Sequence, residues 1–444
     1  MKKFKGSNDC VVSDFLLWQG KPTQVVVKDT YDIKVHPVTN MYNEGPINFN
    51  IPPQPAGMIS NIDIVTSFKV KKGAANLTAT DNCCVINNFA NALWELVDVK
   101  VADRMDLMQS LRNSYAYSTF FNYILNFDKN REDFLSCTQL FAMDTGKTKT
   151  ESESTIFSGD GVKNMGAVNR SKRISGSKSV TVSTPLHCPL FATAKALPSN
   201  MKFRISLSKN SDKFLLIGDS NDYVVHIENI YLNVTFTRPT EIFHGLIEER
   251  LLKEPAPYYV TKPEIIIKPV AQQGRIIRLN DIFTSKLPSH CFICLQRSRD
   301  FDGSIKSNPF TFIPFSKLQL HVNGIPYFTD PLEIESKVEE NERVYPDIRV
   351  FLEQLYKTIG MEKQGSCLVD SKNFHLNFIV GLSLTNDRAG SNVSYLAPSM
   401  NASTQLEIDM GYDMNVSEDL ILIIYALFDR VIKVNADRDI EIIE

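Results

Sequence analysis

Two cysteines with the spacing of a redox or zinc site lie in the second half of the chain, at Cys291 and Cys294. In a β-strand, residues three apart point to opposite faces, so these two thiols would diverge. No second Cys-x-x-Cys pair exists to complete a zinc ribbon. The pattern favours buried strand cysteines. All eight cysteines lack a regular framework, which indicates free thiols of a reducing compartment.

A second candidate for chemistry is Asp144-Thr-Gly-Lys-Thr148, which resembles the end of a phosphate-binding loop. The Walker pattern needs a glycine five residues before Gly146, and Phe141 occupies that position. We therefore interpret this segment as the start of a polar loop.

Metal chemistry of the cupin type would need clustered histidines, with two of them separated by one residue. The sequence has no such pair, and His187-Cys188 has no evident acid partner, although a distant one stays open. Asp300-Phe-Asp302-Gly303 lacks the remaining ligands of a calcium loop. We therefore expect no enzyme activity and no cofactor. The seven histidines are scattered over His36, His187, His226, His244, His290, His321 and His375.

Length and charge narrow the class of protein. The 444 residues suffice for two domains of roughly 200 residues, each with its own core. A net charge of −3 implies no bulk attraction to nucleic acid or to an anionic membrane. The longest apolar run, Leu420–Phe428, ends at Asp429 and is too short to span a bilayer, and the N-terminus does not read as a signal peptide.

The elements that would carry any site are mostly strands. Apolar residues alternate with polar ones in many short runs, which turn clusters of Gly, Asn, Asp and Pro separate. Such a pattern, with few helices, indicates an all-β protein built from sandwiches. The runs lie in Ile62–Val70, Leu96–Val101, Met201–Leu207, Val225–Leu232 (with one slip), Ile265–Ile267, Phe292–Leu295, Leu318–Val322, Phe378–Leu384, Leu406–Met410 and Leu420–Val434.

One strand–helix arrangement occurs twice. Leu96–Val101 precedes a Tyr-led helix at Tyr115–Phe127, with Ser114 as a possible cap, and Leu318–Val322 precedes a second at Tyr345–Ile359, with Gly360 as its stop. The two leading tyrosines lie 230 residues apart, which indicates a duplicated domain.

A third helix, Thr240–Lys253, is followed by Pro255 and Pro257 and is the best candidate for the domain boundary. We therefore expect an arm at residues 1–28, a first domain at 29–250 and a second at 251–444. The longest irregular stretch expected inside a domain is Asp144–Lys178, with seven basic and four acidic residues.

Several blocks, in the same order, resemble the hexon-like major capsid proteins of Polintons (Mavericks) and adintoviruses, in the adenovirus-hexon lineage. The likeness covers residues 55–440. One departure is Ala102-Asp103, where the family usually has Asn-Gly. The matching blocks are Tyr115-Ala-Tyr117, Asp144-Thr-Gly146 (one residue shorter than in the family), Ile174–Val182 with the strand pair after it, Asn308-Pro-Phe310-x-Phe312, Leu318-x-Leu-x-Val322-x-Gly324, Pro331 and Tyr425–Asp439.

The resemblance implies a double jelly roll: two tandem eight-stranded barrels with short helices in the inter-strand loops. It also implies a viral major capsid protein. Three chains would supply six barrels and form a homotrimeric, pseudo-hexagonal capsomer that tiles an icosahedral DNA-virus shell. The chain would then reside in the virion after assembly inside the host cell. Its partners would be further copies, penton or minor capsid proteins and, by weak contact, packaged DNA.

Three regions are candidate sites under this reading. Leu420–Val434 is apolar on both faces, which predicts a central strand or a subunit contact. The residues expected at a trimer interface are Ile421, Ile423, Tyr425 and Leu427. For the helix residues Tyr117, Phe120, Phe121, Phe351 and Leu355 we expect packing on their own barrel rather than direct trimer contact.

The other two regions are polar or terminal. In the Asp144–Lys178 loop, Lys172 and Arg173 would meet packaged DNA or a neighbouring capsomer, unless the loop is only solvated. In the arm, we expect Phe15, Leu17 and Trp18 to dock onto an adjacent subunit, with a simple tail as the alternative.

Two other functions stay open. A jelly-roll protein that binds carbohydrate or a receptor would be a stable monomer with affinity for glycans. A cupin-type enzyme would hold stoichiometric metal.

Overall fold

The computed structural model describes most of the chain after the first 22 residues. The described residues are 23–39, 45–78, 81–102, 105–145, 164–270, 275–283, 286–303, 308–333, 348–362, 365–374, 376–391, 395–398, 400–410 and 419–443.

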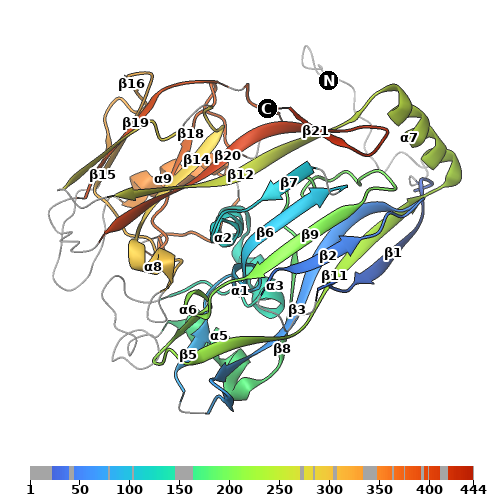
Figure 1. Ribbon diagram of the computed structural model, residues 1–444. Helices are drawn as coiled ribbons and strands as arrows, with labels where there is room; N and C mark the ends of the chain where they lie inside the picture. Colours follow the sequence, from blue (N-terminus) through green and yellow to red (C-terminus); the bar gives the residue numbers. More distant parts are fainter. Residues whose placement is uncertain are drawn as a thin grey trace, which may run out of the picture.

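The first half folds into two antiparallel sheets that face each other (Figure 1). One sheet has the order β1 (Val27–Val35), β11 (Tyr223–Pro239), β3 (Met58–Lys72), with β4 (Ala75–Asn76) and β8 (Val180–Pro185) both paired to β3. The other has the order β2 (Ile47–Ile51), β9 (Phe203–Lys209), β6 (Trp94–Val101), β7 (Met105–Gln109). A small extra sheet joins β5 (Cys83–Val85) to β10 (Leu216–Gly218).

The second half repeats this plan. One sheet has the order β12 (Ala256–Val270), β20 (Leu420–Val434), β14 (His290–Arg297), β18 (Val380–Ser383), with β21 (Ile440–Ile443) paired to β20. The other has the order β13 (Ile276–Asn280), β19 (Thr404–Asp409), β15 (Lys317–Val322), β16 (Ile325–Pro326), with β17 (Leu332–Glu333) paired to β15.

The pairing is nested in the same way in both halves. In each half the first strand pairs with the last long strand, β1 with β11 and β12 with β20. The second strand pairs with a strand that precedes that last long strand, β2 with β9 and β13 with β19. Nested antiparallel pairing across two sheets is the jelly-roll topology. The predicted all-β double jelly roll is confirmed.

The alternation in the sequence maps directly onto these strands. Inward residues of β3, such as Ile62, Ile64 and Phe68, are almost fully buried. The slip in the first-half run at residues 225–232 is a β-bulge, because the register of β11 against β3 shifts between Ile227 and Asn229.

The two Tyr-led helices occupy equivalent loops. α2 (Ser114–Asn126) lies between β7 and β8, and α9 (Ile348–Ile359) lies between β17 and β18. Asn113, with φ of 59°, precedes α2 in place of the expected Ser114 cap, and Gly360 ends α9 with φ of +75°. Tyr345 lies outside the described residues.

The remaining helices lie in loops or link the two barrels. The helix expected near residue 240 is α7 (Glu241–Lys253), which runs from the end of β11 to the start of β12. None of the helices in the described ranges is long and apolar enough to cross a bilayer. The others are α1 (Phe89–Ala92), α3 (Lys129–Gln139), α5 (Met165–Ile174), α6 (Asp212–Leu215), α8 (Ser298–Asp302) and the 3-10 turn η2 (Ser175–Ser177).

The expected irregular stretch Asp144–Lys178 is wrong in its second part, which forms α5 and η2. Residues 146–163 lie outside the described part of the chain. The Ser- and Lys-rich composition hid the helix, whose Gly166, Ala167 and Ile174 form a narrow buried stripe.

Candidate functional site at the junction of the two barrels

Helix α2 belongs to the first barrel but packs against both. Figure 1 shows it between β6 and the strands β12 and β20. Its sequence, SYAYSTFFNYILN, contains no charged residue, and a helix that is apolar on every side must be enclosed. Nine of its thirteen residues are buried: Tyr115, Ala116, Tyr117, Thr119, Phe120, Phe121, Tyr123, Ile124 and Leu125.

Aromatic rings join α2 to the second barrel. Phe120 stacks on Phe310 with ring centroids 4.3 Å apart, and Phe121 stacks on Phe312 at 5.5 Å and on Tyr425 of β20 at 5.3 Å. Aromatic pairs of this kind contribute about 0.5–1.5 kcal/mol each beyond the area they bury. The motif Asn308-Pro-Phe310-x-Phe312 is thus the surface that receives α2.

Tyr117 adds a hydrogen bond to this apolar contact. Its hydroxyl lies 2.8 Å from Gln296 Oε1 and 3.0 Å from the Pro309 carbonyl oxygen, and its ring stacks on Phe301 at 5.4 Å. Burial raises the pKa of Tyr117 well above its usual value, so the hydroxyl stays a donor. Gln296 is fully buried, and this contact satisfies its side chain.

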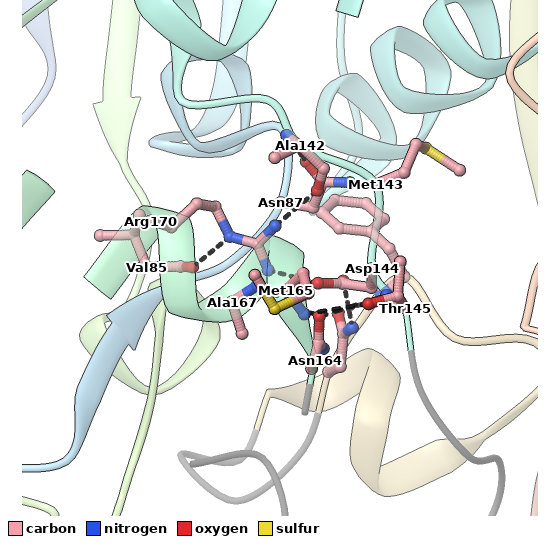
Figure 2. A network of polar contacts seen from close by, with 12 residues as sticks. Val85, Asn87, Ala142, Met143, Asp144, Thr145, Asn164, Met165, Ala167 and Arg170 are labelled. Atoms are coloured by element: carbon pink, nitrogen blue, oxygen red, sulfur yellow. Dashed lines mark hydrogen bonds and ion pairs between the residues drawn. The ribbon is translucent and has the colours of Figure 1, made fainter. Parts of the chain in front are cut away.

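A buried ion pair between Arg170 and Asp144 also lies at the junction of the two barrels (Figure 2). Arg170 of α5 has a side chain only 1% exposed and donates to Asp144 Oδ1 at 2.6 Å, to the Ala142 carbonyl at 2.6 Å and to the Val85 carbonyl at 2.8 Å. Asp144 Oδ2 accepts from Asn308 Nδ2 of the second barrel at 2.7 Å. Both charges are therefore paired and the carboxylate bridges the two barrels.

The network includes Asp144, the first residue of the phosphate-loop candidate, whereas Gly146, Lys147 and Thr148 of that candidate lie outside the described residues. Asp144 and Arg170 are committed to each other, and the ends of segment 146–163 are held together by Thr145 and Asn164. The Asn164 side chain accepts from the backbone amides of Thr145 at 3.2 Å and Ala167 at 3.1 Å (Figure 2). Asp144 is therefore a structural residue that links α5 to the second barrel.

Helix α7 carries a second tie between the barrels. Arg438, in the β20–β21 hairpin, holds both carboxylate oxygens of Glu248 at 2.6–2.7 Å and donates to the Ser199 carbonyl at 2.7 Å. The Ser199 hydroxyl lies 3.1 Å from Glu248 Oε1 and 3.0 Å from His244 Nε2. Burial opposes ionisation, but Arg438 more than offsets it and lowers the pKa of Glu248.

The Ser199, His244 and Glu248 side chains do not form a catalytic relay. In a relay the carboxylate orients the histidine through the ring nitrogen that faces away from the serine. Here Glu248 approaches the same Nε2 as Ser199 does, at 3.6 Å, and it is neutralised by Arg438. The group is a structural link between α7, the hairpin and the residue-199 loop.

The predicted trimer residues lie on β20, between β12 and β14, so the central-strand alternative is confirmed. Ile421, Ile423 and Tyr425 are buried within the single chain and Leu427 is half-buried. Tyr425 covers Phe121 and Phe292. Both faces of the strand are therefore covered without a second subunit, and the trimer contact of these residues stays a prediction that no exposed face supports.

The helix residues divide between the two expectations. Phe351 and Leu355 of α9 pack within their own barrel, where Phe351 meets Phe378 at 5.2 Å, as predicted. For Tyr117, Phe120 and Phe121 the prediction is wrong, because they pack against the other barrel. Their ring partners there include Phe301, Phe310, Phe312 and Tyr425. The absence of charge in α2 was the signal that could have shown a helix enclosed from both sides.

The other predicted sites divide between exposed positions and undescribed ones. Lys172 and Arg173 are exposed on α5, with Arg173 Nη2 3.8 Å from Cys137 Sγ. Phe15, Leu17 and Trp18 lie outside the described residues.

The cysteine and histidine candidates are buried strand or loop residues. Cys291 and Cys294 are free and buried in β14, and burial raises the pKa of the Cys291 thiol to about 12. His187 bonds the Tyr123 hydroxyl at 2.7 Å, and burial lowers its pKa to about 4 while it raises that of Cys188 to about 12. Neither pairing yields a thiolate. The described residues contain no group of three His, Cys, Asp or Glu placed to hold a metal.

Comparison with known sequences gives one distant relative. No protein-family model matches the chain. The uncharacterized protein F54H12.2 of Caenorhabditis elegans is 22% identical over 363 residues, which are 80% of each chain.

Comparison with solved structures is more informative about the fold. A chain of the Sputnik virophage matches with a TM-score of 0.60 at 10% identity, over 98% of this chain and 93% of that one. The Faustovirus major capsid protein matches at 0.57 and 8%, over 94% and 92%. The mavirus major capsid protein matches at 0.55 and 12%, over 98% and 93%. The chain therefore has the fold of double jelly-roll viral major capsid proteins.

Proposed function

We propose that the chain is a viral major capsid protein with a structural rather than an enzymatic role. One observation carries the proposal: the fold shared with capsid proteins extends over nearly the whole chain, and it includes both barrels and their connection. The junction supports it, because a shell needs a stiff unit and α2, Asp144 and Arg438 hold the two barrels against each other.

The assembly we propose is a homotrimer. Three copies would place six barrels around one axis and give a pseudo-hexagonal block that tiles the facets of an icosahedral shell. The duplication supports this arrangement, because two barrels with the same strand order present similar outlines at alternating positions. The trimer contact then belongs on outer barrel surfaces, since the face of β20 is filled from within.

Finer assignments are proposals of the same kind. The domain limits 29–250 and 251–444 are supported by α7, which separates strands that pair only within their own half. The assignment to the Polinton and adintovirus group, within the hexon lineage, is supported by the residue blocks around Tyr115 and Asn308. Penton or minor capsid proteins would be further partners in the virion.

Contact with packaged DNA or with a neighbouring capsomer is proposed for Lys172 and Arg173. Both are exposed on the last turn of α5, next to the buried Arg170 that anchors the helix. If they bind DNA, replacing both with alanine should reduce DNA retention and its dependence on salt. Unchanged retention would leave them as a solvated surface.

The test of the proposed function is the mass and outline of the purified protein. Light scattering should give three times the 50.2 kDa of one chain, about 151 kDa. Electron microscopy should then show particles with threefold symmetry and a hexagonal outline. A stable monomer at micromolar concentration would contradict the proposal, and binding of that monomer to glycans would support the receptor-binding alternative.

A further inference from the structure

Helix α7 presents an apolar face that nothing in the described chain covers. Ile242 is 81% exposed, Leu246 56% and Phe243 40%. Leu246 lies four positions after Ile242 and three after Phe243, which places it beside both on one side of the helix. The opposite side is occupied, since Leu251 is buried and Glu248 bonds Arg438. We call Ile242, Phe243 and Leu246 the α7 face.

The described chain begins beside this face. The Thr240 amide at the start of α7 donates to the Val26 carbonyl at 2.8 Å, and Val27 pairs with Pro239 (Figure 1). Val25, the residue before Val26, is itself an apolar residue that is 72% exposed. The residues that precede Thr23 therefore start next to the α7 face.

Those preceding residues include a short apolar segment. Phe15-Leu-Leu-Trp18 ends five residues before Thr23. An extended chain covers about 3.3–3.6 Å per residue, so Trp18 can reach roughly 17 Å from Thr23. A helix of the length of α7 spans about 20 Å, and Ile242 and Phe243 lie in its first turn. That turn follows Thr240, which is hydrogen-bonded to Val26. The segment is long enough to reach the face of its own chain.

We propose that Phe15–Trp18 docks onto the α7 face of the same chain, in place of the adjacent subunit that the sequence alone led us to expect. Docking would remove three exposed apolar side chains and four more from the arm from water. The tether of four residues between Trp18 and Thr23 keeps the segment at high effective concentration, so a weak contact suffices. The arm would then cover the helix that links the two barrels. This inference concerns the single chain and does not rest on the capsid role.

Trp18 reports on the docking directly. The protein has two tryptophans, and Trp94 is fully buried, so a quencher such as acrylamide senses mainly Trp18. In the full chain Trp18 should be protected and its emission blue-shifted. The variant with Ile242→Lys and Leu246→Lys should show a red shift and stronger quenching. Both substitutions are at exposed positions, so the double variant should fold like the wild type. Ile325→Lys, at a 70% exposed position on β16, is the matched control and should change nothing.

A cross-link separates the same chain from a second copy. The variant carries Leu17→Cys and Leu246→Cys in a background with Cys10→Ser and Cys137→Ser. Under mild oxidation its two new cysteines should form an intramolecular disulfide. The product should run at monomer mass on a denaturing, nonreducing gel, and mass spectrometry of that band should identify the disulfide. Covalent dimers in its place would overturn the proposal and assign the face to the arm of a neighbouring copy. Quenching that is equal in wild type and the double-lysine variant would also overturn it.

Discussion

The two equivalent helices α2 and α9 have opposite surroundings. Both occupy the same loop of their barrels, α2 between β7 and β8 and α9 between β17 and β18. α2 has no charge and is enclosed by both barrels, whereas α9 carries Arg349, Glu353 and Lys357 on an exposed side and buries Phe351 and Leu355 against its own barrel. The duplicated domain contains this helix twice. The charged residues of α9 need solvent, so only the uncharged α2 can be enclosed between the two barrels.

This asymmetry turns two barrels into one body. The first barrel contributes the helix, and the second contributes the rings that receive it, Phe310, Phe312 and Tyr425. No corresponding contact runs from α9 to the first barrel among the described ring pairs. Of these two helices, only α2 contacts both barrels through its rings within the described residues. Substitutions in α2 and in α9 should therefore have different effects.

The largest contrast is expected between Phe120→Ala and Phe351→Ala. Each removes a fully buried ring and should cost about 3–5 kcal/mol of unfolding free energy. Phe120→Ala should also uncouple the barrels, so that calorimetry resolves two transitions. Phe351→Ala leaves the coupling intact and should shift a single transition to lower temperature. Identical thermograms for the two variants would contradict the role of α2 as the coupling element.

Loss of the Arg170–Asp144 ion pair should lower the free energy of unfolding by a similar amount. Arg170→Met leaves Asp144 without its ion partner in a buried site, which should cost about 3–5 kcal/mol in urea denaturation. Adding Asp144→Leu should recover part of this loss, because it removes the unpaired charge. The control is Lys317→Met in the second barrel, whose partner Glu333 is exposed, and this change should cost less than about 1 kcal/mol.

Acid should weaken the first barrel through His187. Its folded pKa is about 4, below the ordinary 6.5, because burial disfavours the charged ring. The unfolded chain therefore binds a proton more readily, and stability present above pH 6.5 is lost as the pH falls toward 4, by about 2–3 kcal/mol. Urea denaturation at pH 7 and pH 4.5 measures this loss, and His187→Gln should reduce it.

A buried histidine of the second barrel, His290 of β14, sharpens the comparison. Burial also lowers the pKa of His290, but its hydrogen bond to the Ala389 carbonyl at 2.9 Å favours the charged ring. His290→Gln should therefore change the acid response less than His187→Gln does. A larger effect at His290 would refute this ranking of the two barrels.

The smallest effect concerns β1 and β12, which stand at the ends of their sheets in the described part of the chain. β12 pairs with β20 over its whole length, and Pro257, Pro263 and Pro269 recur every six residues. Proline has no amide hydrogen, so the unbroken ladder places these positions with their nitrogens facing away from β20. The prolines remove hydrogen-bond donors from the outer edge of β12 and so disfavour its pairing with a strand of another chain. β1 contains no proline.

Replacing Pro263 with valine should change the unfolding free energy by less than about 1 kcal/mol but restore a run of free amides. Light scattering against concentration should then show increased association. Thr261→Val, on the same side of the ladder, keeps the three prolines and should not associate. Equal behaviour of the two variants would mean that the prolines do not protect this edge.

The sequence by itself determined the local features of the fold. Period-two alternation predicted strands such as β3 and β20, the slip near Glu228 matched a bulge, and the paired Tyr-led helices revealed the duplication. These features follow from side-chain spacing within one element, so neighbouring residues are enough to specify them.

Only the tertiary structure decided which surfaces meet. Asp144 and Asn308 are 164 residues apart, and nothing in either segment names the other as its partner. The rings of Phe120 and Phe121 would bury equally well against either barrel, because apolar attraction has no direction. Their actual partners depend on how the two barrels close around α2, and that choice is made by shape and by the few buried polar groups, such as Asp144 and Gln296, that must find a partner.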